Sequence, residues 1–122
     1  MLYTEDLTLF HLEGCSVTRF PLTGSWYETD AVSMAADGSK LRRRCVKVRV
    51  PAPQCRAFVH PSGYAGTGWT VKTGDYLVRG SVELPEGRRW SEIPRLFAAV
   101  GVVTEARDRR VGIAPHIYME GE

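Results

Sequence analysis

The sequence has few cysteines and no long apolar run. None of its apolar stretches approaches the roughly 20 residues that a membrane-spanning helix needs. Glu5 and Asp6 stand where a secretory signal carries basic residues, and no apolar region follows them. The three cysteines are odd in number and form no C-x-x-C pair, which favours free thiols in a reducing compartment (Cys15, Cys45 and Cys55). We therefore expect a protein made and kept inside a cell, with no membrane partner.

Recognisable catalytic and metal-binding patterns are also missing. His11, His60 and His116 lie far apart, with no H-x-x-x-H pair and no acidic or cysteine cluster nearby. The glycines of residues 63–68 have the spacing of neither a phosphate-binding loop nor a dinucleotide fingerprint. A zinc site or a Cys–His pair assembled from distant residues is the alternative. We expect no catalytic, metal-binding or cofactor-binding residues, no cofactor, and a protein that is not an enzyme.

The composition is that of a globular domain. Of 122 residues, 43% are hydrophobic, 10% aromatic and 25% charged. A chain of this length buries roughly two-thirds of its unfolded surface, so one core can hold it together without metal or disulfides. We therefore expect a single domain over residues 1–122.

The net charge of +2 hides an uneven distribution. Residues 1–39 carry six acids and one base, whereas residues 40–79 carry nine bases and one acid. Residues 80–122 are nearly balanced, with six bases and seven acids. Such asymmetry indicates either acidic and basic strands that pair internally or a basic face that meets an acidic partner.

Extended segments dominate the predicted secondary structure. Runs rich in β-forming residues end at glycine, proline or polar turns, at residues 6–12, 16–22, 26–35, 40–50, 69–72, 75–82, 100–107 and 116–120. One short helix is predicted over residues 91–99, with Ser91 as its N-cap and Pro94 in its first turn. We expect a mainly β fold, a small barrel or sandwich of about seven short strands with one short helix and long loops.

The dipeptide Asp37-Gly38 predicts a two-residue hairpin turn between two of these runs. In that register Glu28 pairs with Lys47 and Trp26 pairs with Arg49, so the outward face is one of opposite charges. The other face is mostly apolar, formed by Tyr27, Thr29, Ala31, Val46 and Val48.

Residues 53–68 hold two prolines and three glycines and show little periodicity, which predicts a long loop. An apolar trio within it, residues 57–59, would be costly to leave in water. We expect this loop to be mobile in the free protein and ordered by a partner, with contacts from Phe58, Val59 and Tyr64.

The segment 40–49 is the most basic part of the chain. Basic residues with aromatics nearby are typical of barrels that bind single-stranded nucleic acid. The aromatics do not alternate with the bases along one strand, however, which favours contacts with a protein partner. The predicted contact residues here are Lys40, Arg42, Arg43 and Arg44.

Several segments in order along the chain resemble a family of small proteins of unassigned function from phages and prophages of gut bacteria. The most specific are Gly-Asp-x-x-Val-x-Gly at residues 74–80 and an Asp-x-Arg followed by Pro-His, at residues 108–110 and 115–116. A Trp-Tyr strand at residues 26–27 and a valine-rich strand ending in Pro51 add to the likeness. Where that family usually has Asp-Asn-Arg and His-Trp, this chain has Asp-Arg-Arg and His-Ile.

The resemblance implies a virion structural protein, because such genes tend to lie among the head and connector genes of long-tailed phages. By size and β content the chain is similar to head-closure, or stopper, proteins, which form a ring below the portal and adaptor. The implied partners are the portal or adaptor ring, the tail terminator, further copies of the chain, and genomic DNA that passes without sequence readout. The implied location is the virion, after synthesis in the bacterial host cytoplasm.

Two alternatives stay open. One is a tail-completion or minor tail protein, which belongs to the same structural class. The other, from a different class, is a small nucleic-acid-binding β-barrel. The resemblance implies no catalytic residue for any of these.

Overall fold

Six antiparallel strands close into one barrel in this computed structural model, which describes residues 4–122, without the side chains of residues 31, 33 and 41–43. The order around the barrel is β1-β2-β3-β6-β5-β4, and β4 pairs with β1 to close it. The strands are β1 (Glu5–Glu13), β2 (Ser16–Met34), β3 (Lys40–Pro51), β4 (Tyr76–Arg79), β5 (Val100–Arg109) and β6 (His116–Gly121). The predicted mainly β barrel is thus confirmed.

The barrel core follows from alternation along the strands. Val46, Val48 and Val50 on β3 are fully buried, while Lys47 and Arg49 between them face solvent. Ile117 and Met119 on β6 continue the same buried layer. A second, smaller cluster forms around Phe10 and Ile93, where α1 (Ile93–Leu96) packs against β1, β4 and β5.

β2 is one continuous strand of 19 residues, although the sequence predicted two strands separated at Thr23-Gly24. Gly24 is not a turn residue: it pairs with Glu5 at the end of β1. A Cβ at this position would clash with the carbonyl oxygen of Arg49 on β3. The glycine therefore marks a close backbone approach at which β2 leaves β1 and continues beside β3 alone.

The predicted register of the β2–β3 hairpin is wrong by one residue. The Gly38 N–H donates to the Ala35 carbonyl at 3.0 Å, and the Ala35 N–H donates to the Ser39 carbonyl at 2.8 Å, so three residues form the loop. Gly38 occupies the left-handed region at φ +86°, as the last residue of such a loop does. The extra residue sets Glu28 opposite Val46 instead of Lys47.

A shift of one residue exchanges the two faces of a strand. Trp26, paired with Val48, is therefore in the core at 8% exposure, whereas Tyr27, paired with Lys47, is 63% exposed. Two predictions are therefore wrong: Tyr27 does not lie on the apolar face, and Trp26 does not pair with Arg49.

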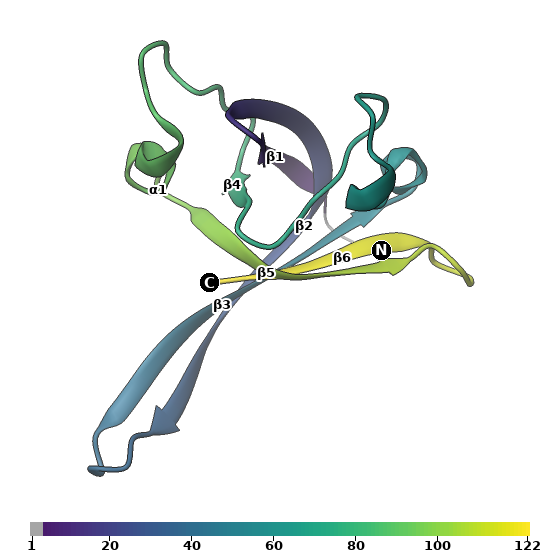
Figure 1. Cartoon of the computed structure of the whole chain (residues 1–122). Helices are drawn as coiled ribbons and strands as arrows, with labels where there is room; N and C mark the ends of the chain where they lie inside the picture. The colour runs from purple at the N-terminus through teal and green to yellow at the C-terminus, as the bar shows by residue number, and fades with distance from the viewer. Residues whose placement is uncertain (1–3) are drawn as a thin grey trace.

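Two hairpins extend from the barrel (Figure 1). Pairing of β2 with β1 ends at Gly24, and pairing of β3 with β6 begins at Val46, so residues 29–45 form a two-stranded arm. On another side, β5 and β6 continue to a turn at residues 110–115, which we call the β5–β6 tip. Figure 1 shows the arm and the tip pointing in different directions from the barrel.

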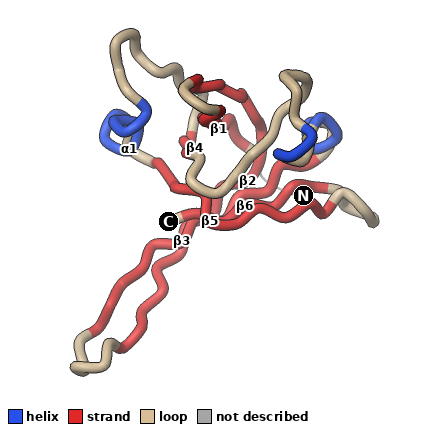
Figure 2. The backbone as a smooth tube through the Cα atoms, in the orientation of Figure 1, coloured by secondary structure: helices blue, strands red, loops and turns tan. Residues whose placement is uncertain are grey.

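The predicted loop 53–68 contains short regular structure that the sequence did not predict. It contains two 3-10 turns, η1 (Gln54–Ala57) and η2 (Pro61–Gly63), which Figure 2 shows on the side of the barrel away from α1. Phe58 forms an isolated bridge with Trp69, and the Trp69 indole N–H donates to the Gln54 carbonyl at 2.8 Å. These contacts pack the loop against the barrel, while its further ordering by a partner stays a prediction.

The predicted helix 91–99 is too long. A 3-10 turn, η3 (Trp90–Glu92), is followed by α1 over only Ile93–Leu96. Arg89 is the N-cap of η3 and Glu92 is the N-cap of α1, so Ser91 caps neither. Phe97 has extended dihedrals of φ −127° and ψ 150°, and its ring stacks on Phe10 with centroids 6.1 Å apart. This contact in the second cluster overrides helix propensity. In the described part of the chain, no helix is long and apolar enough to cross a membrane.

Candidate functional site

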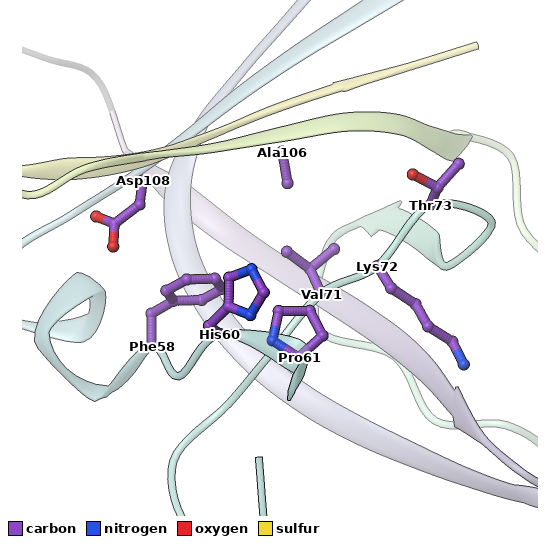
Figure 3. A pocket seen from close by; sticks show the side chains of 8 residues that line it. All are labelled: Phe58, His60, Pro61, Val71, Lys72, Thr73, Ala106 and Asp108. Atoms are coloured by element: carbon purple, nitrogen blue, oxygen red, sulfur yellow. The ribbon is translucent and has the colours of Figure 1, made fainter. Parts of the chain in front are cut away.

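A pocket of about 270 Å³ lies between the loop 53–68, residues 71–73 and β5 (Figure 3). His60 accepts from the Ser62 backbone N–H at 3.2 Å, and its Nδ1 lies 2.7 Å from the Ser62 hydroxyl. Asp108 accepts from the Arg110 guanidinium, which lowers the pKa of that carboxyl. Figure 3 shows Asp108 and Lys72 at opposite ends of the pocket. His60 and Asp108 are thus each engaged by a residue two positions away, and the pocket lining brings no nucleophile, base and orienting group together.

A polar cluster centred on the buried His11 joins β1 to the turn before β4. His11 is fully buried, with Nδ1 2.6 Å from Asp75 Oδ2 and Nε2 2.7 Å from Glu13 Oε2. Both ring nitrogens of His11 therefore lie within hydrogen-bond distance of a carboxylate oxygen, one on the buried Asp75 and one on the exposed Glu13. The buried Asp75 also accepts the Lys72 backbone N–H at 2.9 Å.

The surroundings of His11 are closed by aromatic rings. Phe20 and Tyr64 lie about its imidazole with centroids 6.0 and 5.9 Å away. A buried imidazole with both ring nitrogens partnered fixes the local geometry where β1 meets the turn before β4. The sequence did not reveal it, since Asp75 is 64 positions away. In the described residues, no group of three or more histidine, cysteine, aspartate or glutamate side chains could hold a metal ion.

The predicted contact residues divide into two places. Lys40 and Arg44 lie on the arm, where Arg44 pairs with Glu28 at 2.9 Å. The Trp26 indole N–H donates to the same Glu28 carboxylate at 3.0 Å, and this bond, with the Arg44 guanidinium, lowers the pKa of Glu28. The side chains of the other two predicted residues, Arg42 and Arg43, lie outside the described residues.

The second part of the predicted set lies in the loop 53–68. Phe58 is buried in the core against Trp69, with the Arg110 guanidinium 5.4 Å from its ring centroid, so it is not the exposed contact that the sequence predicted. Val59 and Tyr64 are half-buried. The loop and the arm lie on different sides of the barrel (Figure 1), so the fold does not join them into one surface.

Sequence reasoning missed a basic patch on the outer side of β3, β6 and β5. Across these strands Arg49 pairs with Tyr118 and Tyr118 with Arg107, while His116 pairs with Arg109. A shallow hollow of about 320 Å³ lies among the side chains of this basic face, which are Lys47, Arg49, Arg107, Arg109, His116 and Tyr118. The signal was in the sequence, because Lys47-x-Arg49, Arg107-x-Arg109 and His116-x-Tyr118 each place two such residues on one side of a strand.

Exposed apolar side chains concentrate on the projecting hairpins. In the described part of the chain, the large hydrophobic residues with high exposure are Tyr27, Val32, Met34, Val111 and Ile113. Val32 and Met34 belong to the arm, and Val111 and Ile113 belong to the β5–β6 tip, where they are 97% and 105% exposed. Four of the five thus lie outside the barrel wall.

A comparison with protein-family models matches residues 2–122 of this chain to a family of unknown function, DUF6751. Searches of curated proteins and of solved structures found no match.

Proposed function

We propose a structural role for this chain, which belongs to the DUF6751 family of unknown function: it is a head–tail connector component of a phage virion. In this proposal it is a head-closure, stopper-like subunit that forms a ring below the portal or adaptor. The sequence resemblance supplies the virion context. The observation that carries the proposal is the concentration of exposed apolar side chains on two projecting hairpins.

The β5–β6 tip supports contact with another molecule. Val111 and Ile113 expose essentially their whole side chains, with Gly112 between them and Ala114 after them. Single exposed aliphatic residues are common on soluble proteins, but paired ones at the end of a projection are typical of surfaces that become buried on assembly.

The arm supports contact between copies of the chain. In the described part of the chain, no strand pairs with the outer edge of β2 or of β3 along residues 29–45. Free strand edges recruit further strands, as in strand addition between proteins. The β2 edge carries Asp30 and the β3 edge carries Lys40 and Arg44, so opposite charges distinguish the two edges.

Two different edges on one arm favour a head-to-tail contact. A contact in which the β3 edge of one copy meets the β2 edge of the next is heterologous, and heterologous contacts generate rings when the rotation closes. Electrostatic complementarity then sets direction and suppresses the reversed pairing. A tail-completion or minor tail protein would use the same arm with a different neighbour.

The test is reconstitution with the proteins encoded beside this one in the same genome. The purified chain is mixed with each neighbouring neck protein, and the products are sized by light scattering and imaged as single particles. We expect the chain to enter a ring together with a portal or adaptor protein. A chain that stays monomeric in every mixture contradicts the connector proposal, and incorporation into a tail-only complex supports the tail-completion alternative.

Variants locate the contact. Val32→Ser with Met34→Ser changes the arm, and Val111→Ser with Ile113→Ser changes the β5–β6 tip. Ala98→Ser, at an exposed position outside the two hairpins and outside the loop 53–68, is the control. We expect the control to assemble normally and at least one hairpin variant to lose incorporation, with circular dichroism unchanged in all three.

A further inference from the structure

The basic face defined above has a regular arrangement. Lys47 and Arg49 stand two residues apart on β3, and Arg107 and Arg109 stand two residues apart on β5. Two residues along a strand span about 7 Å, and two strand spacings across the sheet span about 10 Å. β6 lies between these two strands, with Tyr118 in one row with Arg49 and Arg107, Glu120 opposite Lys47, and His116 opposite Arg109. The four cations thus form a slanted grid around Tyr118.

The charges of this face are only partly balanced. Arg107 pairs with Glu105 at 2.5 Å, and this carboxylate raises the pKa of the guanidinium. Among the described residues, Lys47, Arg49 and Arg109 have no carboxylate within ion-pair distance. Like charges held this close repel one another, so an anion that bridges them is bound favourably.

Tyr118 holds the cations in position. The guanidinium carbons of Arg49 and Arg109 lie 6.0 and 5.7 Å from its ring centroid, within the range of cation–π attraction. Its hydroxyl donates to Glu120 at 2.5 Å, and burial together with this bond raises the pKa of Tyr118 to about 12. The phenol is therefore neutral near pH 7 and adds no negative charge to the face.

A second aromatic side chain extends the face. Tyr27 on β2 pairs with Lys47 across the sheet, and its side chain is 63% exposed. Strand pairing thus places aromatic residues beside basic residues of a neighbouring strand, although the two kinds do not alternate along any one strand. Cationic grooves with exposed aromatic rings are typical of nucleic-acid binding, because phosphates meet the cations and bases stack on the rings.

From this arrangement we infer that the outer face of β3, β6 and β5 binds nucleic acid through its phosphodiester backbone, without sequence readout. The cation grid supplies several phosphate contacts, and the exposed ring of Tyr27 offers a stacking surface beside them. An acidic protein or an anionic membrane could also bind the cations, but neither explains the exposed ring of Tyr27. The inference concerns the isolated chain and does not rest on the connector proposal.

The experiment measures binding of a fluorescent 20-nucleotide oligothymidylate by anisotropy, between 50 and 200 mM NaCl. The test variant is Arg49→Gln with Arg109→Gln, and the control is Arg56→Gln with Arg95→Gln, which removes the same charge from exposed positions on η1 and α1. We expect the test variant to bind at least tenfold more weakly at 50 mM salt, with the slope of log affinity against log salt reduced by about 1.4. The control should stay within about threefold of the parent.

Three results would overturn the inference. The first is no measurable binding of the parent chain at 50 mM salt, and the second is an equal loss in the test and control variants. The third is stronger competition, per unit charge, by polyglutamate or by vesicles containing phosphatidylserine than by unlabelled oligonucleotide. The arm and tip variants used for assembly leave the basic face intact, so failure of one proposal is distinguishable from failure of the other.

Discussion

The same pair of strands, β2 and β3, behaves differently in the barrel and in the arm. At residues 46–50 β3 has a strand on each side, and its valines are fully buried. Along residues 29–45 the two strands have only each other, and Val32 and Met34 remain exposed. The difference shows that the number of neighbouring strands, more than composition, decides which apolar residues this chain buries.

The first prediction tests which side chains of β2 are buried, at the consecutive residues Trp26 and Tyr27. Trp26→Ala should lower the free energy of unfolding by about 3–5 kcal/mol, because it leaves a cavity in the core. Tyr27→Ala should change it by no more than about 0.5 kcal/mol, because that ring faces solvent. Urea denaturation of both variants measures this. If Tyr27→Ala lowers the free energy of unfolding as much as Trp26→Ala or more, the register that a two-residue turn predicts is the correct one.

The second prediction concerns the end of the arm. Gly38→Val forces a β-branched residue to φ +86° and should strain the loop by about 1–2 kcal/mol. Because the arm does not belong to the core, this strain should appear as faster amide exchange at Ala35 and Gly38 positions, with little change in global unfolding. Gly87→Val is the control, since Gly87 also has positive φ but lies in the turn before η3. Global destabilisation by Gly38→Val alone would show that the arm folds as part of the barrel.

The third prediction concerns the basic face at high pH. Tyr118 has a pKa of about 12 in the folded protein against 10.0 for the unperturbed group, because burial and the Glu120 bond disfavour the phenolate. Between pH 10 and 12 the unfolded chain therefore loses a proton that the folded chain keeps, so this group's contribution to stability is complete below pH 10 and falls as pH rises. Absorbance at 295 nm should show one late ionisation that Tyr118→Phe removes. If the late ionisation persists in Tyr118→Phe, it belongs to another tyrosine.

Much of the fold was predictable from local patterns. Alternation marked the buried valines of β3 and the strands β5 and β6, and together these gave the mainly β barrel. The hairpin register was not predictable from Asp37-Gly38, because that dipeptide fits both a two-residue loop and the last two positions of a three-residue loop. The continuity of β2 through Gly24 depends on a close approach to Arg49, which is a tertiary contact.

The interaction surfaces were less predictable than the fold. In the sequence, residues 40–49 form one basic run. In the structure, β3 leaves the barrel within this run, and alternate residues face opposite sides of the strand, so the basic side chains do not form one surface. Lys47 and Arg49 join Arg107 and Arg109 from a distant strand, whereas Lys40 and Arg44 lie on the arm. Phe58 was misjudged because its contact with Trp69 depends on the bridge between two separated segments. These arrangements require strand order, which no local pattern specifies.

Hydrogen exchange of the chain, alone and with its neighbouring neck proteins, tests the central claim that the arm is an assembly surface. In the free chain we expect amides of residues 29–45 to exchange much faster than those of residues 46–50, since the arm has few buried contacts. On assembly the arm should become protected while the barrel segment changes little. Strong arm protection in the free chain, or an arm that exchanges equally fast after the chain has joined a complex, would contradict the account.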